Sequence, residues 1–312
     1  ILHPNKLRFI RIFLASLVGI VLLMYLFIQI PWVQNKLVQK ATQSLSQNLG
    51  TEVKVGKVSF TLFNSVDLQE ILIRDQQKDT LLYTHTLKLR ISDIFFSAST
   101  PTIKYIGLEG AKIYLHRKTA TWNYQFLVDY FNKGGQQKNK SYDLKKMEIA
   151  QINFVQDDEW VGQSMHLQSA NIIANFGHFN DSLIQIDQLL VNKPFYTIQN
   201  KKGLRKNITE KKNSLRKLGE LYFNNPNTVI LAKEIKITQG KLWIENNFAK
   251  PTNYFDGFHI RLSELNAQID NASFNKDTIK ANVNLSTKER SGLHLQQLKT
   301  QFRMTPQIME LN

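Results

Sequence analysis

An uninterrupted apolar run near the start of the chain is the strongest pattern in the sequence. Residues 12–30 read IFLASLVGIVLLMYLFIQI and carry no charged side chain. A helix needs about 20 apolar residues to cross the hydrocarbon core of a bilayer. Three basic residues precede the run, and the positive-inside rule keeps that end in the cytoplasm: Lys6, Arg8 and Arg11. The pattern predicts a single-pass signal anchor, with the chain after Pro31 on the far side of the membrane.

Two other interpretations of this run remain open. A cleaved signal peptide would have a shorter apolar core and would end in small residues of the Ala-x-Ala type. This run is longer and ends in Gln29-Ile30-Pro31-Trp32, which offers no such cleavage site. The third interpretation is a buried helix of a soluble protein. The anchor remains our prediction, and it divides the chain into 1–30, 31–50 and 51–312.

The segment that follows has the period of an amphipathic helix. Pro31 suits the first helical turn, and Gly50 suits the position after the last one. The apolar residues between them recur at helical spacing: Val33, Leu37, Val38, Ala41, Leu45 and Leu49. The sequence predicts a helix over 31–49 that either caps a β core or lies on the membrane surface at the mouth of a groove.

From Thr51 onward the apolar period changes from 3.6 to 2, which is typical of β-strands with one apolar face. Turn residues separate the alternating runs. No helices alternate with these runs, so the pattern favours an antiparallel sheet over a parallel α/β fold. The expected strands include residues 53–60, 68–73, 87–91, 106–115, 149–154, 183–191, 235–244, 258–269, 278–285 and 293–304.

Two of these segments resemble each other. Residues 106–115 (IGLEGAKIYL) and 235–244 (IKITQGKLWI) each carry two alternating apolar residues, followed five positions later by another pair. An odd offset turns the second pair to the other face of a regular strand, whereas a bulge or turn at the glycine restores one face. Repeated β units predict an elongated sheet that grows by addition of strands.

Three stretches interrupt the β pattern. Residues 122–131 (WNYQFLVDYF) predict a short helix, and residues 133–141 (KGGQQKNKS) predict a flexible loop. Residues 201–218 are strongly basic, with Glu210 as the only acid. That run is either a solvated segment or a contact for lipid headgroups or a partner protein. Its contact candidates are Lys201, Lys202, Arg205, Lys206, Lys211 and Lys212.

Composition narrows the classes of function and partner that fit this chain. The formal net charge of +15 fits a partner with phosphate groups, and export across a membrane argues against nucleic acid. The chain has no cysteine, so no disulfide can stabilise it. Its histidines form no metal-ligand motif, and neither a phosphate-binding glycine loop nor a nucleophile elbow occurs. Asp157-Asp158-Glu159 has the character of a turn between strands. The sequence predicts no catalytic residue, metal or cofactor, and therefore no enzyme.

The residues after the predicted anchor resemble a known family. The segment 49–60 (LGTEVKVGKVSF), with the helix before it, resembles the start of AsmA-like envelope proteins, the family that includes the TamB proteins of the translocation and assembly module. Residues 75–83, 274–279 and 287–292 resemble its Bacteroidota members. The resemblance covers most of the chain but not the carboxy-terminal domain typical of TamB proteins. We therefore expect these 312 residues to be the front part of a longer polypeptide.

The resemblance implies an inner-membrane-anchored periplasmic bridge. Its long, curled antiparallel sheet would present an open apolar groove to phospholipid or another acyl-chain lipid. A large apolar face is rare on soluble monomers unless something covers it. The groove candidates are Ile113, Leu115, Ile149, Ile235, Ile237, Leu242 and Ile244. The same residues could instead pack a closed β core.

Two functions follow from the resemblance, and a third is weaker. The first is lipid transport towards the outer membrane, in support of outer-membrane biogenesis. The second is assembly of outer-membrane proteins with an Omp85-type barrel, which would bind the missing carboxy-terminal part. The third is a passive structural tether between the membranes.

Overall fold

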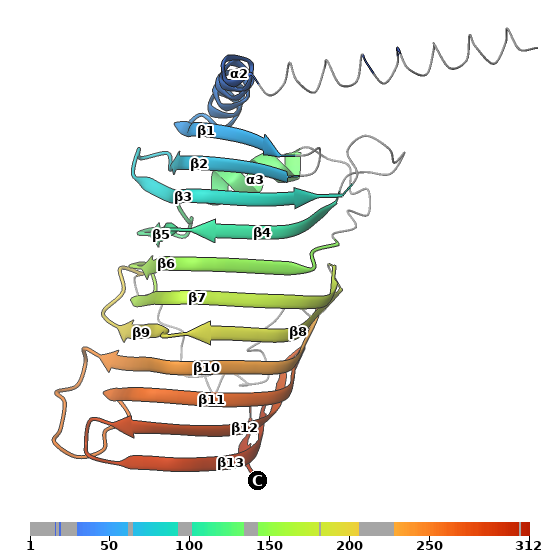
Figure 1. Cartoon of the computed structure of the whole chain (residues 1–312). Helices are drawn as coiled ribbons and strands as arrows, with labels where there is room; N and C mark the ends of the chain where they lie inside the picture. The colour runs from blue at the N-terminus through green and yellow to red at the C-terminus, as the bar shows by residue number, and fades with distance from the viewer. Residues whose placement is uncertain are drawn as a thin grey trace, which may run out of the picture.

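The computed structural model describes residues 30–61, 65–92, 102–133, 143–180, 182–205, 228–305 and 307–312, together with Ser16 and Gly19. This part of the chain is mainly β and forms one large curled sheet with few helices (Figure 1). Almost all of the predicted anchor, 12–30, lies outside the described residues. Among the residues that are described, no helix is both long enough and apolar enough to cross a bilayer.

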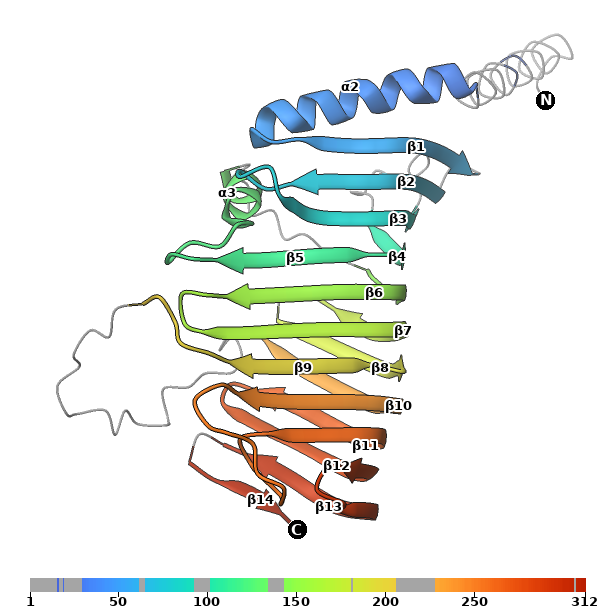
Figure 2. The same ribbon diagram turned by 90° about the vertical axis from the view of Figure 1, so that its left-hand side faces the viewer.

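The first described helix, α2 (Pro31–Leu49), confirms the helix predicted from the apolar period. It ends at Gly50, which adopts the left-handed conformation with φ of 64°. The helix runs along the first strand, β1 (Val53–Thr61), as Figure 2 shows. Ser46 Oγ accepts a hydrogen bond of 3.0 Å from the Val53 amide and so joins the helix to this strand. The helix therefore caps one edge of the sheet.

The remaining strands overlap the segments expected from the period of 2, except for three strands that the expectation did not include: Gln163–Phe179, Phe195–Asn200 and Met309–Leu311. They are β2 (Ser65–Arg74), β3 (Thr80–Ile91), β4 (Ile103–Glu109), β5 (Lys112–Arg117), β6 (Lys146–Asp158), β7 (Gln163–Phe179), β8 (Leu183–Asn192), β9 (Phe195–Asn200), β10 (Val229–Asn246), β11 (Ile260–Asn275), β12 (Thr278–Glu289), β13 (His294–Met304) and β14 (Met309–Leu311). They pair in the order β1-β2-β3-β4-β6-β7-β8-β10-β11-β12-β13-β14. β5 follows β4 along the same edge of β6, and β9 follows β8 along the same edge of β10.

The expectation of a purely antiparallel sheet is wrong, because the sheet is mixed. β4 and β5 run parallel to β6, and β8 and β9 run parallel to β10. Parallel neighbours need a crossover of a dozen or more residues. Residues 118–145 and 201–228, 28 residues each, separate these strand pairs. The first crossover contains the predicted short helix, α3, which spans Gln125–Lys133 rather than 122–131.

The described residues enclose only a small buried apolar cluster, made by Leu144, Ala174 and Phe176 with partly buried neighbours. Each strand contacts only the strands beside it, and α2 contacts only β1 and α3. No second sheet of described residues packs on the strands, and among the described helices only α2 contacts a strand, β1. The architecture is therefore a single curled layer rather than a sandwich.

Candidate functional site

A line of backbone irregularities crosses the sheet from strand to strand, and we call it the crease. Six residues on it have positive φ values between 50° and 65°: Glu70, Gly110, Gln151, Lys193, Gln239 and Glu264. The pairings that flank them place all six at the same level of their strands. The crease therefore divides nearly every long strand into two halves.

The crease moves the alternation of side chains by one position. On β10, Ile237 pairs with Ala267, Gly240 with Leu265 and Leu242 with Leu262, with register shifts around Gly240. Gln239, between them, has a φ of 53° in the left-handed region, which breaks the regular alternation, so Ile237 and Leu242 point to the same side although five positions separate them. This is the bulge that the sequence predicted for 235–244. In 106–115 the same change occurs at Gly110, where β4 gives way to β5.

Apolar residues then form continuous rows on one face, here called the inner face. One row follows the pairings from β1 to β13: Val58, Leu68, Leu87, Leu108, Ile149, Ile172, Val191, Ile237, Ala267, Leu285 and Leu298. A second row lies beyond the crease: Val53, Ile73, Leu82, Ile113, Phe154, Leu167, Tyr196, Leu242 and Leu262. The second row ends at Glu289 on β12.

The structure places all seven groove candidates on this inner face. Ile149 and Ile237 belong to the first row, and Ile113 and Leu242 belong to the second. Ile235 lies two residues from Ile237 on the same strand. Leu115 and Ile244 lie in a further row, joined through Gln156, Met165 and Ile198.

The rows are half-buried although no described element covers them. None of the residues in the first row is exposed, and Val58 retains only 4% of its accessible surface. By contrast, the alternate positions of the same strands carry exposed lysines, including Lys57, Lys88 and Lys236. Half-burial without a covering layer is expected where side chains converge on the inner side of a curl.

Small and hydroxyl-bearing residues at the crease support this assignment. Ala111, Thr84 and Ser169 retain 0%, 1% and 5% of their accessible surface. The Thr84 hydroxyl donates to the carbonyl of Glu109 at 2.9 Å, and the Ser169 hydroxyl donates to that of Asn192 at 2.8 Å. These carbonyls leave the regular ladder at the crease, and a buried carbonyl needs a donor. Small and hydroxyl-bearing side chains therefore occupy the crease, where the bend of the strands leaves little space.

Neither a scan against models of protein families nor a search of curated proteins finds a match to this chain. The site is therefore interpreted from its own geometry.

The structure describes only some of the basic contact candidates. Lys201, Lys202 and Arg205 are described, whereas Lys206, Lys211 and Lys212 lie outside the described residues. Lys201 Nζ lies 2.7 Å from Asp157 Oδ1, so its charge is already paired. Lys202 and Arg205 are exposed. Of the described candidates, only these two present side chains that are open to a headgroup.

The acidic triplet serves the turn between β6 and β7, as its sequence predicted. Asp157 pairs with Lys201, and Glu159 Oε1 lies 3.5 Å from Lys118 Nζ. Arg117 makes a bidentate pair with Asp158, with N–O distances of 2.9 and 2.6 Å. Burial raises the pKa of the Asp158 carboxyl, but the Arg117 hydrogen bonds and the backbone amides outweigh burial and leave that pKa lowered. These acids join the turn to β5 and to the second crossover.

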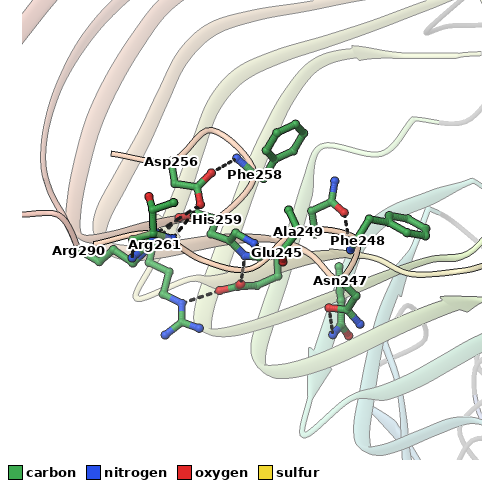
Figure 3. A network of polar contacts seen from close by, with 12 residues as sticks. Glu245, Asn247, Phe248, Ala249, Asp256, Phe258, His259, Arg261 and Arg290 are labelled. Atoms are coloured by element: carbon green, nitrogen blue, oxygen red, sulfur yellow. Dashed lines mark hydrogen bonds and ion pairs between the residues drawn. The ribbon is translucent and has the colours of Figure 1, made fainter. Parts of the chain in front are cut away.

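A second polar network surrounds the loop between β10 and β11 (Figure 3). His259 Nδ1 lies 2.9 Å from Glu245 Oε2, and His259 Nε2 lies 3.0 Å from the Ala249 carbonyl. Arg261 Nε reaches the other oxygen of Glu245 at 2.5 Å, and Arg290 Nε donates to the His259 carbonyl at 3.0 Å. These contacts have a structural role: they hold in place a loop whose other side chains are mostly exposed.

Sequence reasoning missed the crease as a continuous feature. From the sequence alone, Thr84 and Ser169 are only polar residues within otherwise apolar strands. The shared signal is an apolar alternation that shifts by one position near a glycine, glutamine or glutamate, as at Gln69-Glu70, Gln151 and Gln239-Gly240. That signal recurs at intervals of 81 and 88 residues, from Glu70 to Gln151 and from Gln151 to Gln239.

Proposed function

We propose that this chain carries lipids along the inner face of its sheet. The observation that supports this most is a continuous apolar face that no described part of the chain covers. Monomeric soluble proteins seldom leave so large an apolar surface to water. Acyl chains suit it because they are apolar, flexible and long relative to the spacing of the strands. Ten strand spacings separate β1 from β13, which corresponds to about 48 Å along the row at 4.8 Å each.

The rows also suit movement of a bound chain. Burial of each methylene contributes about 0.8 kcal/mol, so an acyl chain would be held without any polar contact. Neighbouring strands offer chemically similar aliphatic side chains, and a chain can move by one strand spacing without losing contact area. The crease supplies the two walls of a trough. Such transport makes and breaks no covalent bond, and needs neither a catalytic residue nor a metal.

The predicted anchor and the resemblance to AsmA-like proteins complete the proposal. The chain would be held in a bacterial inner membrane by 12–30, with the sheet in the periplasm directed towards the outer membrane. α2 lies along β1 at the edge of the sheet, and it directly follows the predicted anchor in the sequence. An Omp85-type barrel would be the partner at the opposite end of the sheet. The alternative function is assembly of outer-membrane proteins without lipid transport.

Photo-crosslinking at paired positions tests the proposal. Ile237 lies on the inner face, and Lys236 beside it is exposed on the other face. A photoreactive amino acid is placed at either position of the full chain in cells, and crosslinked products are identified by mass spectrometry. Lipid adducts at position 237 and their absence at 236 are expected.

The adducts also separate the two functions. Equal labelling at both positions, or no lipid adduct at position 237, would contradict the lipid conduit. Peptide adducts of outer-membrane proteins at position 237 would favour the assembly factor, because its clients would then occupy the inner face. Circular dichroism of both substituted chains checks that the sheet is intact.

A further inference from the structure

A buried carboxylate lies where the turn between β2 and β3 meets β5. Asp75 has no accessible surface. Its Oδ1 accepts hydrogen bonds of 2.9 Å from the amides of Gln77 and Asp79. Its Oδ2 accepts a hydrogen bond of 3.1 Å from Asn123 Nδ2, in the segment before α3. A charged carboxylate this deeply buried needs a compensating positive charge.

The nearest candidate for that compensation is His116 on β5. Its Nδ1 is buried, has no hydrogen-bond partner and lies 3.9 Å from Asp75 Oδ2. The Tyr114 ring stacks on the imidazole at 5.1 Å, and Asn123 Oδ1 accepts the His116 amide at 3.0 Å. The ring is therefore held with this nitrogen directed at the carboxylate. A lone pair facing a carboxylate is unfavourable, so a proton or a metal cation belongs between them.

A third ligand is present beside this pair. One carboxylate oxygen each of Asp75 and Asp79 and one ring nitrogen of His116 all lie within 4.8 Å of one another. A cavity of about 510 Å³ opens onto the group, and Asp79, His116, Asn123 and Asp129 line it. The cavity gives a hydrated ion access from solvent. A proton would satisfy two of these groups, whereas a dication would satisfy all three.

The neighbouring cations do not neutralise the group. Arg117 Nη2 is 2.6 Å from Asp158 Oδ2, and Lys118 Nζ is 3.5 Å from Glu159 Oε1. Both are therefore paired at the β6 end of the cavity. Within the described residues, neither Asp75 nor Asp79 forms an ion pair with a lysine or arginine, and the facing imidazole is the nearest basic group.

We propose that Asp75, Asp79 and His116 bind a divalent transition-metal ion, with water completing its coordination. One imidazole and two carboxylates form a ligand set that zinc and manganese accept. Tetrahedral zinc ligands at about 2.1 Å from the metal lie about 3.4 Å apart. The 3.9 Å between Asp75 Oδ2 and His116 Nδ1 is close to that spacing. Asn123, which touches both Asp75 and the His116 backbone, would orient the ligands.

The ion would act as a cross-link. It would join the β2–β3 turn to β5, since β2 and β5 each pair with β3 but not with each other. A chain without cysteine has no disulfide to do this. The site is independent of the inner face, so the metal proposal and the lipid proposal stand or fall separately.

Zinc binding to the full chain in detergent tests the proposal. The chain is treated with EDTA, dialysed against limiting ZnCl2, and analysed for metal by mass spectrometry. About one zinc per chain is expected. His116→Ala and Asp79→Asn should each lower the affinity at least about tenfold, in line with the loss of a ligand. Zinc should raise the melting temperature of the unsubstituted chain and leave that of His116→Ala unchanged.

His85→Ala is the matched control. His85 also lies against a carboxylate, with Nδ1 2.5 Å from Glu70 Oε1, but both side chains are exposed and no third His, Cys, Asp or Glu among the described residues joins them. This variant should bind zinc as the unsubstituted chain does. Absence of zinc, binding unchanged by His116→Ala, or equal loss in His85→Ala would overturn the proposal. Circular dichroism excludes unfolding, and Asp79 is chosen because it is exposed.

Discussion

His259 makes two hydrogen bonds that only a protonated imidazole can donate together. The Glu245 carboxylate and the Ala249 carbonyl are both acceptors, at 2.9 and 3.0 Å from the two ring nitrogens. The Glu245 hydrogen bond raises the pKa of His259 above its ordinary value, against the opposing effect of burial. Burial raises the pKa of Glu245, but the hydrogen bonds from His259 and Arg261 lower it further than burial raises it.

The raised pKa predicts a pH dependence for the loop between β10 and β11. The stabilisation from His259 is fully present below its unfolded pKa of about 6.5 and is lost as pH rises through the higher folded pKa. Protection of the amides near Ala249 from hydrogen exchange, corrected for the intrinsic pH dependence of exchange, should therefore fall as pH rises above about 6.5. His259→Ala should show low protection throughout and no such transition. His166→Ala is the control, because the His166 ring contacts the amide oxygen of Asn153 rather than a carboxylate. An unchanged transition in His259→Ala would contradict the assignment.

At the scale of elements, the turn between β6 and β7 holds the start of the second crossover. The Gly162 carbonyl accepts the Lys201 amide at 2.8 Å, and the Glu159 carbonyl accepts the Leu204 amide at 2.9 Å. Gly162 has φ of 91°, and a Cβ on it would lie 2.1 Å from the Lys201 carbonyl oxygen. Only glycine permits both the conformation and the close approach.

This contact predicts that Gly162→Ala destabilises the chain more than backbone strain alone. Gly292 has a similar φ of 97°, but nothing lies within 4 Å of where its Cβ would be. Gly292→Ala should cost about 1–3 kcal/mol from strain. Gly162→Ala should cost more, because the crossover must also move away. Urea unfolding of both variants measures the difference, and equal costs would mean that the crossover does not press on the turn.

At the scale of the whole molecule, the two crossovers make the sheet a repeated structure. β4 and β5 stand before the first crossover as β8 and β9 stand before the second, and the parallel strands β6 and β10 follow. The hydroxyls of Thr84 and Ser169 make equivalent hydrogen bonds in the two units. Repetition keeps the crease aligned, so the apolar rows run unbroken across units.

An unbroken row predicts that one charge can interrupt transport along it. Ile237→Asp places a carboxylate in the middle of the first row, and an unpaired charge against acyl chains costs several kcal/mol. Because no described layer packs on Ile237, the sheet should survive the change. The expected result is normal protein abundance with a leaky outer membrane. Lys236→Asp, on the opposite face, should leave both normal.

Abundance and membrane integrity are measured together. Loss of Ile237→Asp protein would indicate that the residue is packed in a closed core. Normal abundance with an intact outer membrane would show that the inner face carries no lipid. Equal defects in both variants would indicate a general effect of charge on the chain.

Much of the architecture could be predicted from local patterns. The helix over 31–49, most of the strand positions and the face of Leu242 and Ile244 follow from residue periods, because these periods report which side of each element avoids water. The bulge near Gly240 was also predictable, since an odd spacing of apolar pairs has few other solutions. Such inferences need only neighbours within one element.

Strand direction and strand alignment depend on contacts between distant residues, and no local period records them. The two 28-residue gaps are long enough for parallel crossovers, but loops of that length also join antiparallel strands. Thr84 and Ser169 interrupt apolar strands for a reason that only the bend across several strands supplies. Likewise, Asp75 and His116 lie 41 positions apart and come together only because β3 pairs with both β2 and β5. Residue periods therefore determine the faces of the sheet, whereas long-range pairing aligns the crease across the strands and brings Asp75 and His116 together.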